Sequence, residues 1–270
     1  KKIARLGFEQ HHVSYAAYQE YSRKFSKTKL VPLPNLLAKE RMIKDEQEIE
    51  LIRQAANIVD QTFEHILGFI KPGMKEVEVA FELECYMRKL GAEASAFDII
   101  VASGVRSALP HGVASNKVIE PGDLVTLDFG AVYQGYCSDI TRTIAVGEPP
   151  EKLKEIYQIC LEAQKLGVSK IKPGLTGKEA DAICRDYIAK HGYADQFGHS
   201  TGHGLGLEVH EFPRLSHQVE EKLQPGMVVT VEPGIYISGL GGVRIEDDLL
   251  LTETGNEVLT HSPKELIMIN

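Results

Sequence analysis

Four acidic residues and one histidine carry the chemistry that this sequence offers. Asp128 and Asp139 stand 11 residues apart on either side of a short turn. Glu232 and Glu246 stand 14 residues apart around a glycine-rich loop, and His203 lies in a separate segment rich in glycine. Carboxylates and a neutral imidazole suit hard or borderline divalent cations. The five residues predict a site for two divalent metal ions, which would leave a bridging water or hydroxide as the nucleophile.

An internal duplication gives two of these acids equivalent positions. The string Ile-Lys-Pro-Gly begins at Ile70 and again at Ile171, and in each copy another glycine follows 18 residues after the first. A Pro-Gly pair then comes seven residues before Asp128 and again before Glu232, counted from the proline. Units of this kind cover their apolar faces by packing against each other. We therefore expect Asp128 and Glu232 at matching points of two packed halves.

The spacing within each pair of acids predicts their placement on a sheet. Side chains alternate between the two faces of a strand, so an odd separation across a two-residue turn puts Asp128 and Asp139 on one face, opposite or diagonal. The even separation of Glu232 and Glu246 requires an odd loop or a bulge, which the glycines between them permit. Carboxylates that meet in this way repel each other unless a cation joins them.

A single acid after a strand is more often a turn or surface residue than a ligand. The prediction of a metal site therefore depends on several such residues occurring together at equivalent positions of the repeat. Asp247 and Asp248, beside Glu246, illustrate the ordinary case. We expect these two aspartates to form a hydrogen-bonded and solvated pair that binds no metal.

Three more histidines could serve a reaction at this site. His111 and His210 could donate hydrogen bonds to a substrate carbonyl or to the charge of a tetrahedral intermediate. For His199 two roles stay open, contact with the substrate or a core position in which the backbone satisfies the ring.

Amphipathic helices precede the strands in both halves. Apolar residues recur at steps of three and four from Ile49 to Ile66, which predicts one long helix. A second helix is predicted over 75–90, with Gly91 as its left-handed cap. The counterparts in the second half are a helix over 153–167 and one that begins at Thr176 with capping-box spacing.

Each pair of helices leads into a predicted hairpin. Strands over 124–129 and 138–146 flank the tight turn 133–136, and strands over 228–232 and 243–251 flank the glycine-rich loop. The predicted class is α+β, with two hairpins in one curved antiparallel sheet and the helices outside it.

Composition excludes several kinds of partner. The chain has 270 residues, 43% of them hydrophobic, which is enough for a full-sized core. A net charge of −8 without a basic run argues against nucleic acid. No apolar run approaches the roughly 18 residues of a membrane span, and no signal peptide is recognisable. Four scattered cysteines without C-x-x-C spacing predict reduced core thiols of a cytoplasmic protein.

The first 43 residues differ from the rest. They predict a strand over 3–8, a helix over 14–25 and a strand over 30–34, which are too few elements to bury a core. The chain begins at Lys1 without a methionine. We expect residues 1–43 to be the remnant of a largely missing N-terminal domain with its linker, and residues 44–270 to form the domain that holds the site.

At these residues the chain resembles the metallopeptidases of the pita-bread fold, the group of methionine aminopeptidase, aminopeptidase P and prolidase. The resemblance runs from about Lys44 to the C-terminus, and residues 1–43 resemble the end of the N-terminal domain of prolidases and aminopeptidases P. It implies a full-length homodimer and manganese as the metal, with cobalt, iron or zinc as alternatives.

The resemblance also assigns roles. It implies that Asp139 and Glu246 bridge both metal ions, that Asp128 completes one metal site, and that His203 with Glu232 completes the other. Glu232 is in addition the expected residue for proton transfer.

Two segments resemble the proline-specific branch, 203–211 and 241–247. They imply an Xaa-Pro dipeptidase acting on short peptides with proline second, with His111 and His210 as catalytic and substrate-contacting residues and Arg244 in the same pocket. Aminopeptidase P acting on longer peptides stays open, and so does a non-catalytic binding member of the fold. Creatinase and methionine aminopeptidase are disfavoured by the complete carboxylate set and by Arg244.

Overall fold

The computed structural model describes residues 3–34 and 36–270. The chain divides into two compact units, residues 1–41 and 42–270. Every residue predicted for the metal site lies in the second unit. Among the described residues, no helix combines the length and the apolar character that crossing a bilayer requires.

The first unit is a strand, a helix and a strand, as predicted. Strand β1 (Arg5–Glu9) pairs in parallel with β2 (Lys29–Leu33), and helix α1 (Tyr15–Lys24) connects them. The Ser14 side chain caps α1 by accepting a hydrogen bond from the backbone N–H of Ala17. Helix α2 (Leu36–Met42) follows in the chain.

Two pairs of helices in the second unit confirm the duplicated pattern. Their bounds are α3 (Glu46–Phe69), α4 (Glu76–Lys89), α5 (Glu151–Lys170) and α6 (Gly177–Lys190). Capping boxes begin α3 at Asp45 and α6 at Thr176. The predicted glycines end α4 and α6, since Gly91 and Gly192 have φ angles of 103° and 88°. The repeated glycines of the sequence therefore mark equivalent helix ends in the two halves of the structure.

The first hairpin carries the two aspartates. Strand β5 (Leu124–Phe129) pairs with β8 (Ile140–Val146), and the same register continues into β6 (Ala131–Tyr133) and β7 (Tyr136–Cys137). The hairpin closes on a two-residue turn whose φ angles, 46° and 83°, are those of the predicted tight turn. Asp128 lies opposite Thr141, so Asp139 is its diagonal neighbour, as the odd spacing predicts.

The second hairpin repeats this plan with a longer turn. Strand β11 (Val228–Val231) pairs with β14 (Asp247–Leu251), and β12 (Gly234–Ile237) pairs in the same register with β13 (Gly241–Arg244). The loop between β12 and β13 has three residues, 238–240. This odd loop confirms the prediction from the even spacing, because it places Glu232 and Glu246 directly opposite each other.

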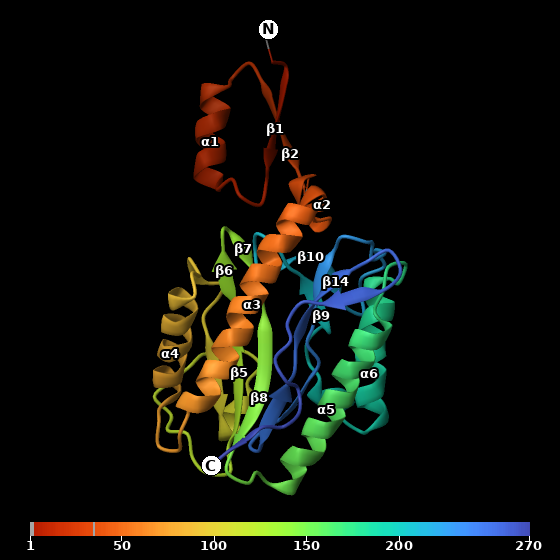
Figure 1. Ribbon diagram of the computed structural model, residues 1–270. Helices are drawn as coiled ribbons and strands as arrows, with labels where there is room; N and C mark the ends of the chain where they lie inside the picture. The colour runs from red at the N-terminus through yellow and green to blue at the C-terminus, as the bar shows by residue number, and fades with distance from the viewer. Residues whose placement is uncertain (1–2, 35) are drawn as a thin grey trace. The chain divides into compact units, whose positions relative to one another are not determined.

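The predicted single sheet is divided into several hydrogen-bonded sheets. Their strand orders are β16-β8-β5-β4, β10-β9-β11-β14-β15, β12-β13 and β3-β6-β7. The remaining strands are β3 (Ala94–Ser95), β4 (Ile100–Ser103), β9 (Gly202–Gly204), β10 (Glu211–Leu215), β15 (Asn256–Val258) and β16 (Met268–Ile269). Between the halves, the Glu246 N–H donates to the Thr141 carbonyl at 3.1 Å. Helices α3 and α4 pack on first-half strands, and α5 and α6 on second-half strands (Figure 1).

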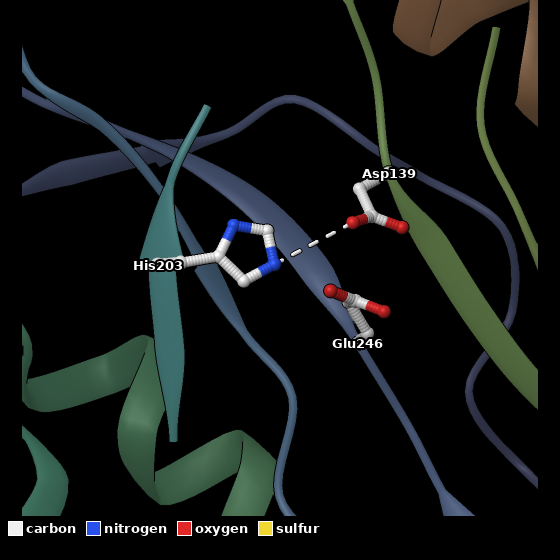
Figure 2. Close-up of side chains that lie close together, drawn as sticks. All are labelled: Asp139, His203 and Glu246. Atoms are coloured by element: carbon white, nitrogen blue, oxygen red, sulfur yellow. Dashed lines mark ion pairs between the residues drawn. The ribbon is translucent and has the colours of Figure 1, made fainter. Parts of the chain in front are cut away.

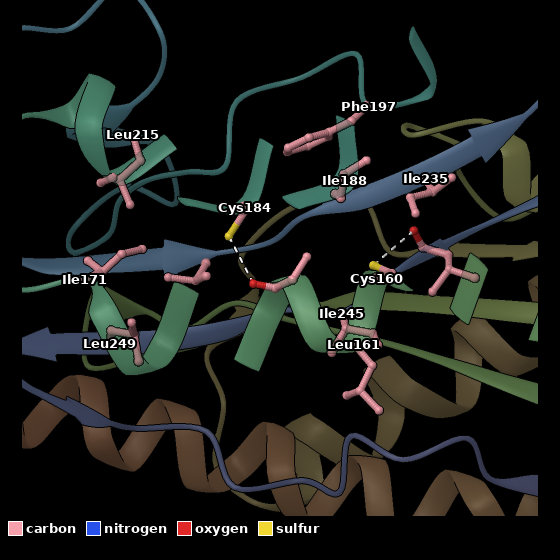
Figure 3. Close-up of a cluster of buried hydrophobic side chains, with 14 of the residues drawn as sticks. Cys160, Leu161, Ile171, Cys184, Ile188, Phe197, Leu215, Ile235, Ile245 and Leu249 are labelled. Carbon is pink, nitrogen blue, oxygen red and sulfur yellow. Dashed lines mark hydrogen bonds between the residues drawn. The ribbon is translucent and has the colours of Figure 1, made fainter. Parts of the chain in front are cut away.

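A closely packed core lies between the helices and the strands of each half. In the second half it contains Cys160 and Cys184, whose thiols donate to backbone carbonyl groups at 3.1 and 3.3 Å (Figure 3). The four cysteines are free thiols, of which three are buried and Cys85 is half-buried. Each fully buried leucine or isoleucine contributes on the order of 2 kcal/mol, so the strands that carry the site rest on a rigid base.

Candidate metal centre

All of the predicted site residues line one cavity of about 550 Å³. The five predicted ligands in it are Asp128, Asp139, His203, Glu232 and Glu246. The other predicted residues in it are His111, His199, His210 and Arg244. The five predicted ligands come from the two hairpins and β9, so residues more than 100 positions apart in the chain meet here.

Three of the five ligands form a compact buried group. Figure 2 shows Asp139, His203 and Glu246 pointing toward one another, and their ligand atoms all lie within 4.8 Å of one another. The Nε2 atom of His203 is 3.6 Å from the Asp139 carboxylate and 3.4 Å from that of Glu232. A cation at the centre of this group could reach several of these atoms at once.

Glycines on both sides of His203 let strand β9 approach its neighbours. A Cβ atom on Gly202 would lie 2.0 Å from the Thr230 carbonyl oxygen, and one on Gly204 would lie 2.2 Å from that of Phe212. No side chain fits at either distance. The glycine-rich sequence therefore allows β9 to lie between β10 and β11 with the imidazole facing the acids.

The His203 imidazole has the tautomer of a metal ligand. Its Nδ1–H donates to the Gly204 carbonyl at 3.1 Å, so Nε2 keeps a lone pair that faces the acids. Burial, together with the neighbouring His210, lowers the pKa of His203 to about 3. The ring is therefore neutral at physiological pH and available for coordination.

Two buried carboxylate oxygens in the site lack a partner. Asp139 Oδ1 and Glu246 Oε1 accept no hydrogen bond within the described part of the chain. The other Glu246 oxygen accepts from the Thr141 hydroxyl at 2.5 Å. An unsatisfied buried carboxylate oxygen is costly, and a divalent cation satisfies it. The residues present thus fit the metal that their sequence predicted.

Without a cation, the acids favour their protonated forms. Burial raises the pKa of Glu246 to about 8, with Asp128 as a further cause. Burial also raises the pKa of Asp139 and of Glu232 well above the ordinary value, and in both cases the nearby Glu246 adds to the effect. A divalent cation would replace these protons.

A chain of hydrogen bonds joins Asp128 to His199. Asp128 forms an ion pair with Arg244, which donates to the Tyr236 hydroxyl at 2.8 Å. The His199 Nδ1–H donates to the Ser200 carbonyl, so the Tyr236 hydroxyl donates to His199 Nε2, at 2.8 Å in both cases. Burial, with Arg244, lowers the pKa of His199 to about 4. The backbone satisfies one ring nitrogen and the Tyr236 side chain the other, while His199 also lines the cavity, so both roles considered for this histidine stay open.

His111 and His210 lie at the edge of the cavity with exposed side chains. The rings of His210 and His203 are 4.3 Å apart, centre to centre, and nearly perpendicular. Burial and the nearby Arg214 lower the pKa of His210. Neither histidine is needed to hold the acids in place, which leaves both free for a bound molecule.

Asp247 and Asp248 correct one expectation. They bind no metal in the predicted scheme, yet both are completely buried, so the expectation of a solvated pair is wrong. Strand β14 has a neighbouring strand on each edge, and all five of its residues are buried, so its side chains are packed on both faces. Asp248 accepts a hydrogen bond from the Asp139 N–H at 3.0 Å, and Asp247 forms an ion pair with Arg142 at 2.7 Å. These carboxylates hold the backbone that carries the ligands.

The sequence patterns did not identify three residues of the site. Thr141 binds Glu246, Tyr236 binds His199, and the exposed Arg214 lines the cavity. The alternation of side chains could have found the first two, because Thr141 is two residues after Asp139 and Tyr236 is four after Glu232. Arg214 gives no such signal, since β10 is irregular between 211 and 214.

A duplicated α+β fold with buried acids and a neutral imidazole around one cavity defines a metallopeptidase of the pita-bread class. The chain belongs to metallopeptidase family M24, whose model matches residues 50–253. A second model, the creatinase/prolidase N-terminal domain, matches residues 1–43. The boundary between the models lies close to the division of the structure into two units.

Named relatives are similar over nearly the whole chain. The uncharacterized peptidase YqhT of Bacillus subtilis is 63% identical over 99% of this chain and 76% of its own length. A solved structure of an Xaa-Pro dipeptidase from Bacillus anthracis matches with a TM-score of 0.97 and 62% identity, over 98% of this chain and 74% of that one. An X-Pro aminopeptidase from Thermotoga maritima matches with a TM-score of 0.94 and 47% identity, over 99% and 76%.

Proposed function

We propose that the protein hydrolyses Xaa-Pro dipeptides with two divalent metal ions held by the five predicted ligands, Asp128, Asp139, His203, Glu232 and Glu246. The observation that carries the proposal is the pair of unpartnered, buried carboxylate oxygens beside the neutral imidazole. Manganese is the proposed metal, on the family resemblance, with cobalt, iron or zinc as alternatives. Bound there, such ions polarise a carbonyl group and acidify water.

An Xaa-Pro bond makes particular demands on the protein. Proline contributes no N–H to a backbone-binding groove, and its nitrogen must be protonated as it leaves. Glu232 suits that proton transfer, because burial raises its pKa and it lies next to His203 in the cavity. His111 and His210 provide N–H donors for the charge that develops on the substrate oxygen.

Arg214 supports dipeptides over longer substrates. Its guanidinium lines the cavity and forms no ion pair with any described residue. A dipeptide places its C-terminal carboxylate one residue from the scissile bond, where this cation can bind it. The likeness to an X-Pro aminopeptidase favours the second candidate, an enzyme that accepts longer Xaa-Pro peptides.

Four substrates separate the candidates. Hydrolysis of Ala-Pro, Ala-Pro-amide, Ala-Pro-Ala and Met-Ala is measured with manganese and again with a chelator. A dipeptidase cleaves Ala-Pro best and loses activity with the chelator. Cleavage of Ala-Pro-Ala and Ala-Pro-amide at the rate of Ala-Pro identifies an aminopeptidase. Chelator-sensitive cleavage of Met-Ala alone contradicts the proline-specific assignment, and metal binding without any cleavage indicates a binding protein.

Assembly and location complete the proposal. We propose a homodimer for the full-length protein, which light scattering tests directly. A reducing compartment such as the cytoplasm suits its free thiols, since Cys137, Cys160 and Cys184 are buried without disulfides.

A further inference from the structure

Glu76 is a buried carboxylate that the site described so far does not use. It is the first residue of α4, its side chain is completely buried, and it is absent from the lining of the cavity. Oε1 accepts hydrogen bonds from the Ser103 N–H at 2.7 Å and hydroxyl at 2.8 Å. Oε2 accepts from the Ser115 N–H at 3.1 Å and hydroxyl at 2.7 Å. One carboxylate thus joins both ends of the segment 104–114, which we name the His111 loop.

An ion pair holds the middle of the His111 loop to the same carboxylate. Arg106 pairs with Glu76 Oε2 and donates to the Val113 carbonyl at 2.9 Å. The loop carries two groups of the cavity, the His111 ring and the Pro110 carbonyl, which accepts from Arg244 at 3.1 Å. No described residue forms a hydrogen bond with the His111 imidazole, so the position of the loop backbone sets the region that this ring can reach.

Helix stabilisation does not account for Glu76. An acid in the first turn favours a helix, and Glu78 fulfils that role by accepting from the Lys75 N–H at 2.6 Å in a capping box. The five hydrogen bonds and ion-pair contacts of the Glu76 carboxylate all go to the His111 loop and its two flanking serines. Burying a carboxylate is costly, and these contacts offset that cost only while the loop keeps this conformation.

We propose that Glu76 is a positioning residue for the reaction, which fixes the His111 loop so that His111 and Pro110 face the substrate. The expected kinetic effect of Glu76 rests on the proposed function, whereas its effect on the conformation of the His111 loop rests on the structure alone. Misplacement of a group in an active site by about 1 Å can reduce the rate about 100-fold. Glu76 therefore acts on the reaction through His111 while touching neither metal nor substrate.

A double-mutant cycle separates positioning from general stability. The values of kcat and KM for Ala-Pro are measured in the manganese-loaded wild type, Glu76→Gln, His111→Ala, the double variant and the control Glu78→Gln. We expect Glu76→Gln to reduce kcat/KM about 10- to 100-fold and Glu78→Gln less than about 2-fold. In the His111→Ala background, Glu76→Gln should cost less than about 3-fold, because both changes remove one interaction. Equal losses in both backgrounds overturn the proposal.

Hydrogen exchange tests the loop without any activity. Peptides that cover 104–115 should exchange at least about 10-fold faster in Glu76→Gln than in Glu78→Gln, with manganese affinity unchanged in both. Unchanged exchange overturns the proposal, even if the wild type fails to cleave Ala-Pro, an outcome that would refute the proposed function separately. If Glu76→Gln does not fold, Ser115→Ala replaces it in both experiments, since it removes one contact at the end of the loop.

Discussion

Glu246 determines how the metal-free protein should respond to pH. Its pKa is raised from 4.5 to about 8 in the folded state, mainly by burial. Between these values the folded state holds a proton that the unfolded state has lost, so the free energy of unfolding falls as pH rises. His199 and His203 act in the opposite sense below pH 6.5, because folding lowers their pKa values to about 4 and about 3. Between pH 6.5 and about 8 the raised pKa of Glu246 is therefore no longer opposed by these two histidines.

The size of the effect follows from that window. One pKa unit corresponds to 1.36 kcal/mol, so Glu246 alone should cost about 2 kcal/mol of stability over 1.5 pH units. Asp139 and Glu232 change stability in the same direction, since burial raises their pKa values as well. Burial also raises the pKa of Asp248, which is not a predicted ligand. With manganese bound the ligand acids are deprotonated throughout, so their part of the loss should disappear while binding releases protons.

Urea unfolding at pH 6.5 and 8.0, with chelator and with saturating manganese, measures both effects. The control is Glu246→Gln with chelator, which should show a smaller dependence on pH than the wild type. Calorimetry of manganese binding in two buffers with different ionisation enthalpies counts the protons released. A chelated wild type that is as stable at pH 8.0 as at pH 6.5 would refute the account of these buried acids.

Three further predictions concern single residues. Arg214→Ala should raise KM for Ala-Pro roughly 10- to 100-fold and leave KM for Ala-Pro-amide unchanged, because the lost contact is to the substrate carboxylate; equal effects on both substrates would contradict this. Asp139→Asn should lower manganese affinity at least about 100-fold by calorimetry, more than the loss of a supporting residue does, while a normal affinity would exclude it as a ligand. Gly204→Ala should lower stability by roughly 1–3 kcal/mol in urea, since a Cβ there meets the Phe212 carbonyl, whereas the control Gly198→Ala has open space and should change little.

Local rules explain what the sequence made predictable. Capping boxes at Asp45 and Thr176 fix where two helices begin, and the separation of each pair of acids determines their faces through the period of two along a strand. The even separation of Glu232 and Glu246 requires an odd loop or a bulge, and the structure has a three-residue loop at 238–240. Each of these inferences uses the local sequence only and is independent of how the two halves of the molecule pack.

Contacts between distant segments explain what could not be predicted. Whether Asp248 is solvated depends on the first hairpin, where the Asp139 N–H, 109 residues away in the sequence, donates to its carboxylate. The chain from Asp128 to His199 needs Arg244 of one hairpin to reach across to the other hairpin, over 116 residues of sequence. Glu76 meets serines 27 and 39 residues away. In each case tertiary packing determines the polar partner, and no periodicity or spacing in the sequence indicates which residue it is.

The two hairpins differ in how they arrange their acids, although the two halves are duplicated. In the first hairpin the acids are diagonal neighbours and one of them, Asp128, is engaged by Arg244, whereas in the second hairpin the acids stand directly opposite each other. The two hairpins therefore present acids in unequal geometries and with unequal charge. His203, on β9, faces the side where Asp139, Glu232 and Glu246 crowd together and would supply a neutral ligand there. A further carboxylate at this position would add to the repulsion that already raises the pKa of those acids, which favours a neutral histidine there.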